Sequence, residues 1–210
     1  MTPRGGEDAT AVASVVVTGG AGYLGTLALE ALSKQGVERL TSLDVGEAKR
    51  RVKGVRYERA DIRSADLAGL FEEVGADAVV HLAAIVNPPP DMEDATLHEI
   101  EVGGTERVLA ACVETGVHHV TIASSGAAYG YWPRNQGRFL TEDDPVPGSP
   151  AFAYSRHKAE VESLAAGYRE QHPELEQLIL RPGTVLGEAT DNLITDLFTK
   201  PVVMGLRGVD

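Results

Sequence analysis

The sequence contains almost no cysteine and no long apolar run. Cys112 is the single cysteine among 210 residues, so an internal disulfide is excluded and a buried, reduced thiol is expected. No apolar run approaches the roughly 18 residues that a bilayer span requires, and residues 1–14 lack the apolar core of a signal peptide. We therefore expect a cytoplasmic protein with no membrane partner.

An excess of positive charge is also missing. The 19 Lys and Arg residues face 31 Asp and Glu residues, which gives a net charge of −12. The one basic run, Lys49-Arg50-Arg51, is more typical of a solvated loop than of a patch that neutralises a phosphate backbone. We therefore expect no nucleic-acid partner. Histidines such as His81 and His157 lack metal-ligand spacing, so no metal site is predicted.

Short β-branched or apolar runs alternate along the chain with stretches rich in Ala, Leu and Glu. The runs predict strands at 12–18, 39–43, 55–58, 78–82, 119–123 and 178–180, with helices at 24–34, 66–74, 99–115 and 153–171. This alternation is typical of repeated βαβ units. It predicts an α/β fold, a doubly wound parallel sheet with helices on both faces. Polar segments at 87–94 and 132–150 are expected at the carboxyl edge, where such folds bind ligands.

A glycine-rich turn follows the first predicted strand. Gly19, Gly22 and Gly25 precede an amphipathic helix, as in the dinucleotide-binding fingerprint. Gly19 would permit the tight turn, Gly22 the approach of the pyrophosphate, and Gly25 close packing of the helix on the strand. The pyrophosphate is then expected at the start of that helix, beside Tyr23 and Leu24, where free N–H groups favour negative charge.

Two acidic positions complete the predicted adenosine site. Asp44 ends the second strand and is placed to accept hydrogen bonds from the ribose hydroxyls, which favours NAD over NADP because a 2′-phosphate would meet a like charge. The nearby basic run, Lys49-Arg50-Arg51, weakly favours NADP. Asp61 and Ile62 follow the third strand and are candidates to bind the adenine, although a plain turn aspartate is the alternative for Asp61.

Together the motifs resemble the extended short-chain dehydrogenase/reductase family, the NAD-dependent epimerase/dehydratase group, over residues 13–187. The resemblance rests on 18–25 (TGGAGYLG), Asp61-Ile62, 81–84 (HLAA), 124–130 (SSGAAYG), 154–158 (YSRHK) and 181–183 (RPG). It implies a Rossmann domain followed by a smaller substrate domain, with hydride transfer at the nicotinamide C4.

Candidate catalytic residues come from two of these motifs. Tyr154 and Lys158 are spaced to share one face of a helix. A phenol is a poor base at neutral pH, but a neighbouring ammonium and the positive nicotinamide ring favour the phenolate, so Tyr154 is a plausible general acid/base. Lys158 would also hold the nicotinamide ribose. The resemblance assigns the substrate-orienting hydroxyl to Ser125, with Ser124 as the weaker candidate.

The resemblance also implies further cofactor contacts after the fourth and sixth strands. They are Leu82, Ala83, Ala84, Pro182, Gly183 and Val185. For the two alanines, simple packing at the strand end is an equal alternative. Tyr129, Tyr131 and Trp132 are candidates for a substrate wall or for plain packing.

The sequence departs from the family pattern in three respects. Glu101 stands where the family often has an asparagine, which places a proton relay through that position in doubt. Gly126-Ala127 stands where sugar dehydratases carry an acidic pair, which disfavours a 4,6-dehydratase. The third departure is length, since few residues follow Gly183. We divide the chain into a tail (1–11), an NAD(P)-binding domain (12–187) and a remnant or start of a substrate-binding region (188–210).

The functional prediction is an NAD-dependent oxidoreductase or epimerase that acts on a secondary alcohol or ketone of a small molecule, first of all a sugar or nucleotide sugar. The alternative is a catalytically inactive NAD(P)-binding regulatory or scaffold protein, which would not need Ser125, Tyr154 and Lys158 together. A homodimer is expected, because the helices near 95–115 and 152–171 resemble the pair that the family uses for two-fold assembly.

Overall fold

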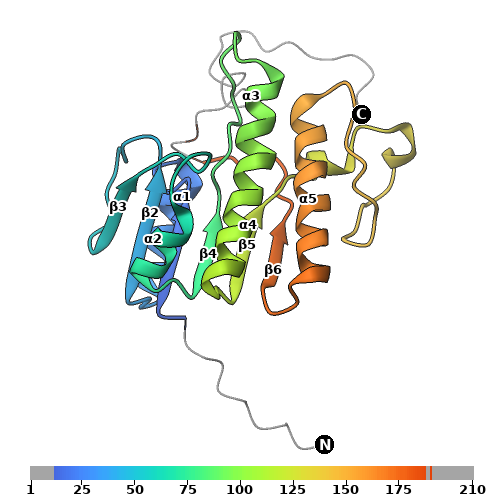
Figure 1. Cartoon of the computed structure of the whole chain (residues 1–210). Helices are drawn as coiled ribbons and strands as arrows, with labels where there is room; N and C mark the ends of the chain where they lie inside the picture. Colours follow the sequence, from blue (N-terminus) through green and yellow to red (C-terminus); the bar gives the residue numbers. More distant parts are fainter. Residues whose placement is uncertain (1–11, 188–189, 191–210) are drawn as a thin grey trace, which may run out of the picture.

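The computed structural model describes residues 12–187 and residue 190 and has the predicted α/β Rossmann fold (Figure 1). Six parallel strands form one sheet in the order β3-β2-β1-β4-β5-β6. Their bounds are Ser14–Thr18 (β1), Arg39–Asp44 (β2), Val55–Arg59 (β3), Ala78–His81 (β4), His119–Ala123 (β5) and Glu176–Leu180 (β6). The predicted tail 1–11 and, apart from Thr190, the segment 188–210 lie outside the described residues.

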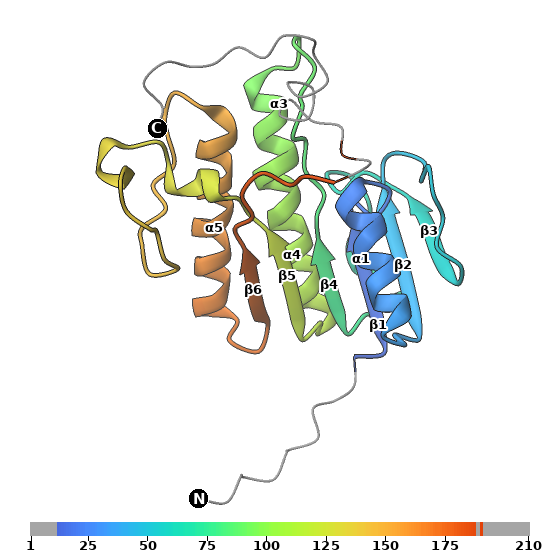
Figure 2. The same cartoon turned by 180° about the vertical axis from the view of Figure 1, so that it is seen from behind.

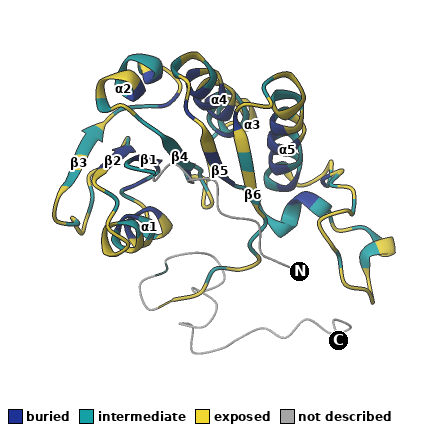
Figure 3. Ribbon diagram, turned by 90° about the horizontal axis from the view of Figure 1, so that it is seen from below, coloured by how far each residue is buried: buried dark blue, intermediate teal, exposed yellow. Residues whose placement is uncertain are grey.

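Helices lie on both faces of the sheet, unevenly. They are α1 (Tyr23–Lys34), α2 (Leu67–Val74), α3 (Asp94–His98), α4 (Gly104–Thr115) and α5 (Ala153–Gln171). One face carries α2, α4 and α5, and α1 covers β1 and β2 on the other, as Figures 2 and 3 show. Within the described residues, no helix is both long and apolar enough to cross a membrane.

The central strand explains why the sheet has a core on each side. Every residue of β1 is buried, and successive side chains of a strand point to opposite faces. Val16 joins the core under α2, α4 and α5, whereas Val15 and Val17 join the core under α1. An uninterrupted valine run therefore supplies both cores. The buried thiol of Cys112, on α4, belongs to the first core, where burial raises its pKa to about 12.

The predicted helix at 99–115 is interrupted near its start. A π-helical turn, Glu99–Gly103, joins α3 to α4 and buries the side chain of Glu101. Such insertions into helices occur frequently at functional sites. A regular 3.6-residue pattern contains no signal for the inserted residue, so this turn was not predicted.

On the α1 side, the edge strand β6 leaves apolar side chains exposed. Leu178 and Leu180 alternate with Ile179, which packs into the core beneath α5. Among the described helices, only α1 lies on this side, and it packs against β1 and β2 (Figure 3). Leu178 and Leu180 are therefore exposed on a part of this face that none of the described α-helices covers.

Candidate active site

The glycine-rich turn lies at the carboxyl end of β1, in contact with the end of β4. Gly19 has φ +69, the left-handed region that favours glycine. A Cβ at this position would lie 2.7 Å from the backbone N of Ala83 and 2.7 Å from the carbonyl carbon of Leu82. The tight turn predicted for Gly19 is therefore present, and it brings residues 82–83 beside the start of α1.

Gly22 and Gly25 have different surroundings at the start of α1. Gly22 is the extended N-cap residue and provides no side-chain cap, and a Cβ there would contact only the Gly19 carbonyl oxygen, at 3.2 Å. The space beyond is open. A Cβ at Gly25 would collide with the Gly19 carbonyl oxygen and lie 2.6 Å from the Gly20 Cα. The close packing expected of Gly25 is thus against the turn itself.

Asp44 closes the turn from the end of β2. Its Oδ2 accepts a hydrogen bond from the Ala21 amide at 3.1 Å, and its Oδ1 accepts one from the Gly46 amide at 2.8 Å. Each carboxylate oxygen can accept a second hydrogen bond. The predicted ribose contact is therefore compatible with the position of Asp44. In the basic run, Arg50 forms an ion pair with Glu30 at 2.7 Å.

Asp61 and Ile62 differ in accessibility. The carboxylate of Asp61 binds the Arg63 guanidinium at 2.6 Å, and the hydrogen bonds from Arg63 hold the pKa of Asp61 below its usual value. Ile62 is buried in the core, where its side chain closely approaches Gly104. An adenine contact through either residue stays a prediction.

Two hydrogen bonds connect α5 to the chain on either side of Ser125, one to the end of β5 and one to Ala127. Lys158 Nζ donates to the carbonyl oxygen of Ala123 at 3.3 Å, and Ser155 Oγ donates to that of Ala127 at 2.6 Å. Both donors lie in the first turns of α5, as does Tyr154. The segment that carries Ser125 is therefore attached to the start of α5, which carries Tyr154 and Lys158, at the carboxyl edge of the sheet.

The Ser125 hydroxyl also caps a short 3-10 helix, η2 (Gly126–Tyr129), by accepting from the Ala127 amide at 3.1 Å. Ser125 is half-buried, as is Tyr154. The Lys158 ammonium lies 5.7 Å from the centroid of the Tyr154 ring. The positive charge of Lys158 therefore lies over the Tyr154 ring, and the two residues share one face of α5 as their spacing predicted.

Lys158 also has an acidic partner. Its Nζ lies 2.8 Å from Glu101 Oε2, and the two side chains are only 5% and 3% exposed. The second oxygen of this carboxylate, Oε1, accepts from the Ile85 amide at 2.7 Å. Glu101 thus connects the segment after β4 to α5.

The neighbouring Ser124 has a different environment from Ser125. Its hydroxyl donates to Glu162 Oε1 at 2.5 Å and is buried. The same carboxylate receives two guanidinium nitrogens of Arg181, Nη2 at 2.6 Å and Nε at 3.0 Å. Ser124 is therefore part of a buried structural network, which supports Ser125 as the hydroxyl that faces a ligand.

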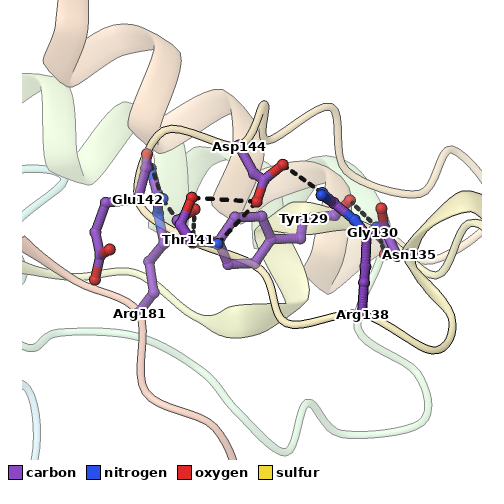
Figure 4. Close-up of polar contacts among 8 residues, drawn as sticks. All are labelled: Tyr129, Gly130, Asn135, Arg138, Thr141, Glu142, Asp144 and Arg181. Atoms are coloured by element: carbon purple, nitrogen blue, oxygen red, sulfur yellow. Dashed lines mark hydrogen bonds and ion pairs between the residues drawn. The ribbon is translucent and has the colours of Figure 1, made fainter.

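Arg181 extends this network into the segment after η2 (Figure 4). Its Nη1 donates to the Tyr129 hydroxyl at 2.8 Å and to the Glu142 carbonyl at 3.3 Å. The Tyr129 hydroxyl donates in turn to the Thr141 carbonyl at 2.9 Å. Tyr129 therefore packs and anchors the loop, and of the two alternatives predicted for it, packing is confirmed.

The rest of this loop contains further internal contacts, which Figure 4 shows. Arg138 forms an ion pair with Asp144, and Asn135 Nδ2 donates to the Gly130 carbonyl at 2.9 Å. Trp132 also packs, because its Nε1 donates to the Gly148 carbonyl at 2.9 Å. Tyr131 is 72% exposed and stays a candidate for a substrate contact.

The segment after β6 continues the sheet pairing beyond the last residue of the strand. The Ser124 amide donates to the Leu180 carbonyl at 2.8 Å, and the Gly126 amide donates to that of Pro182 at 2.9 Å. This pairing holds residues 182–183 beside Ser125. Gly183 is exposed, and a Cβ added there would meet no atom within 4 Å. The cofactor contacts predicted for Pro182, Gly183 and Val185 stay predictions, as do those of Leu82, Ala83 and Ala84.

His81, at the end of β4, lies next to Thr18, the residue that precedes the glycine-rich turn. Its Nδ1 lies 2.6 Å from Thr18 Oγ1 and its Nε2 lies 3.0 Å from Thr105 Oγ1. Burial, and secondarily the charge of Lys158, lower the pKa of His81 to about 3. His81 is therefore a neutral, hydrogen-bonded residue, in agreement with the packing role expected from the sequence.

Two features of the site have no clear signal in the sequence motifs. Glu162 belongs to none of the motifs, although it continues the helical spacing of Tyr154 and Lys158 along α5. The ion pair of Glu101 with Lys158 was not foreseen either, because the two residues are far apart in the sequence. The sequence signal for Glu162 is its acidic side chain at a position on the buried face of α5.

These features define a dinucleotide-binding α/β domain with serine, tyrosine and lysine at the carboxyl edge. The sequence model of the NAD dependent epimerase/dehydratase family matches residues 15–202, and the chain belongs to this family. The resemblance drawn from the motifs is thereby confirmed, and the NAD dependence of the family agrees with the cofactor predicted.

Several characterised proteins are similar to the chain. The UDP-glucose 4-epimerase of Azospirillum brasilense is 31% identical over 178 residues, which cover 82% of this chain and 49% of that protein. The 3 beta-hydroxysteroid dehydrogenase/Delta 5-->4-isomerase of vaccinia virus (strain Copenhagen) is 28% identical over 194 residues, covering 84% of this chain and 54% of the viral protein.

The crystal structure of the UDP-glucose 4-epimerase of Thermus thermophilus in complex with NAD is similar with a TM-score of 0.74 and 33% identity. The similarity covers 85% of this chain and 57% of that one. The chain thus spans about half the length of the curated relatives it matches.

The open space at Gly22 gives a first prediction. A Gly22→Val variant should fold, because the residue has an extended backbone with φ −71 and its Cβ meets only one atom. The valine side chain would occupy the predicted pyrophosphate position, so we expect at least a tenfold loss of NAD affinity by calorimetry. A Gly25→Ala control should instead lower the melting temperature, because its Cβ collides with the turn. Unchanged affinity in folded Gly22→Val would remove the turn from the cofactor site.

Proposed function

We propose that the chain carries out NAD-dependent oxidation and reduction at a secondary alcohol or ketone, as an epimerase or dehydrogenase, with Tyr154 as the acid/base. The observation that supports this most is the attachment of α5 on both sides of Ser125, through Lys158 at Ala123 and Ser155 at Ala127. A protein that only bound the cofactor would need the glycine-rich turn but not this arrangement.

The residues present fit NAD. The uncapped start of α1 and the open space at Gly22 suit a pyrophosphate, and Asp44 retains acceptor capacity for ribose hydroxyls. NAD, when bound, supplies the position that accepts and returns a hydride. The segments at 82–84 and 182–183 would lie along the cofactor on either side of β5.

The proton is handled by the chain itself. Tyr154, as phenolate, accepts the proton of the substrate hydroxyl as the carbon loses its hydride, and as phenol it returns the proton to the carbonyl oxygen. Ser125 donates a hydrogen bond that orients the substrate oxygen. The Lys158 ammonium favours the phenolate electrostatically, and it has a hydrogen-bond donor left for the nicotinamide ribose, because Ala123 and Glu101 use two of its three.

A sugar nucleotide is the substrate class that we propose. The epimerases of Azospirillum brasilense and Thermus thermophilus, both similar to this chain, are named for UDP-glucose. The vaccinia virus relative, named for a hydroxysteroid, represents a second class of secondary alcohol. Both classes require the same proton transfer at one hydroxyl.

The test is a screen of UDP-sugars, free aldoses and hydroxysteroids, following NADH absorbance and the epimeric product. Turnover of a UDP-sugar is expected. NAD binding with no turnover of any of these compounds would favour the inactive regulatory or scaffold protein instead.

Cofactor preference is a second prediction. Asp44 would repel a 2′-phosphate, so calorimetry should give NAD at least a tenfold higher affinity than NADP. An Asp44→Asn variant should narrow this difference. Equal affinities in the unmodified protein would indicate that the basic residues 49–51 govern the ribose site.

A further inference from the structure

Glu101 is a buried acid in the site that the proposed mechanism does not use. It lies in the π-helical turn Glu99–Gly103, and both of its carboxylate oxygens have partners from different elements. Oε1 accepts from the Ile85 amide at 2.7 Å, and Oε2 lies 2.8 Å from Lys158 Nζ. Such a completely partnered, 3% exposed carboxylate holds its neighbours in fixed positions.

We propose that Glu101 is a positioning residue of the reaction: it holds the Lys158 ammonium beside Tyr154 and opposes part of the positive charge that favours the phenolate. This inference rests on the proposed function, because it concerns how strongly Lys158 acts on Tyr154. The ion pair with Lys158 also explains why this chain can have an acid at position 101, where the family often has an asparagine.

The geometry requires a carboxylate in particular. The Ile85 amide and the Lys158 ammonium are both donors, so both oxygens of the Glu101 side chain must accept. The amide of glutamine has one acceptor and one donor group, so it satisfies only one of these partners. Aspartate retains both acceptors and the charge, but its shorter side chain cannot reach both partners from the same backbone position.

The other ionisable groups around this pair leave Glu101 as the main opposing charge. His81, on β4, faces Lys158 and is neutral, since its pKa is lowered to about 3. Also on α5, the buried His157 lies 3.2 Å from Asp94, which also pairs with Arg156. One turn beyond Lys158 on α5, the buried carboxylate of Glu162 is paired with Arg181 at 2.6 Å. Glu101 is therefore the buried carboxylate that pairs directly with Lys158.

The decisive measurement is the pH profile of kcat for substrate oxidation, using the UDP-sugar identified by the screen. Removing the charge with Glu101→Gln should move the rising limb of the profile about one pH unit lower, a tenfold change in proton affinity, and lower kcat. Glu99→Gln is the matched control, because Glu99 is exposed on the same turn. Its profile should coincide with that of the unmodified protein.

Glu101→Asp separates position from charge, and it decides the matter if the glutamine variant does not fold. We expect its rising limb at the original pH with kcat reduced at least fivefold. An unmoved or raised limb in folded Glu101→Gln, an equal shift in Glu99→Gln, or full kcat in Glu101→Asp would each overturn the proposal. Failure of the unmodified protein to turn over any substrate would instead reject the proposed function.

Discussion

Tyr154→Phe is expected to reduce turnover by at least about a hundredfold, the usual loss when general acid/base catalysis is removed. Phenylalanine keeps the ring but has no hydroxyl to exchange a proton with the substrate. The half-buried Tyr154 has no hydrogen bond in the described structure that the change would break, so NAD affinity and the melting temperature should change little. Steady-state kinetics with the identified substrate, together with calorimetry, provide the measurement.

Tyr168→Phe is the matched control, since Tyr168 lies on the same helix and its ring packs beside His172 at 5.7 Å between centroids. Turnover of this variant should stay within about twofold of the unmodified protein. Normal turnover of Tyr154→Phe would exclude Tyr154 as the acid/base, whereas a parallel loss of NAD affinity would point to a binding role.

Glu162→Ala is expected to destabilise the fold by about 3 kcal/mol, because removing one partner of a buried ion pair leaves the other charge uncompensated. Glu162 is 3% exposed and binds Arg181, whose side chain is 19% exposed. The Ser124 hydroxyl also loses its acceptor. Urea unfolding monitored by circular dichroism would measure the change.

Glu170→Ala provides the control for this variant. Glu170 is exposed near the end of the same helix, where such a substitution should change the free energy of unfolding by less than about 0.5 kcal/mol. Equal stability of the two variants would show that the network of Glu162 and Arg181 is not what secures the loop drawn in Figure 4.

The fold was predictable because its signals are local. An unbroken run such as Val15-Val16-Val17 is typical of a strand that is buried on both faces, and it forms the centre of the sheet. Glycine spacing likewise predicted the tight turn, since a positive φ at Gly19 strongly restricts the residue type. The spacing of Tyr154 and Lys158 placed them on one helix, α5, which begins at the predicted residue.

Pairings between distant segments were decided only by the tertiary structure. Periodicity could not distinguish Ser124 from Ser125, because adjacent side chains at the end of a strand point in different directions. Only the position of Glu162 shows that the Ser124 hydroxyl is already hydrogen-bonded within the protein. Nor could it pair Glu101 with Lys158, since that contact depends on a π-helical turn and on how α5 packs against it. Local spacing determines which elements form and which residues share a face. Which buried charges compensate one another depends on how those elements pack.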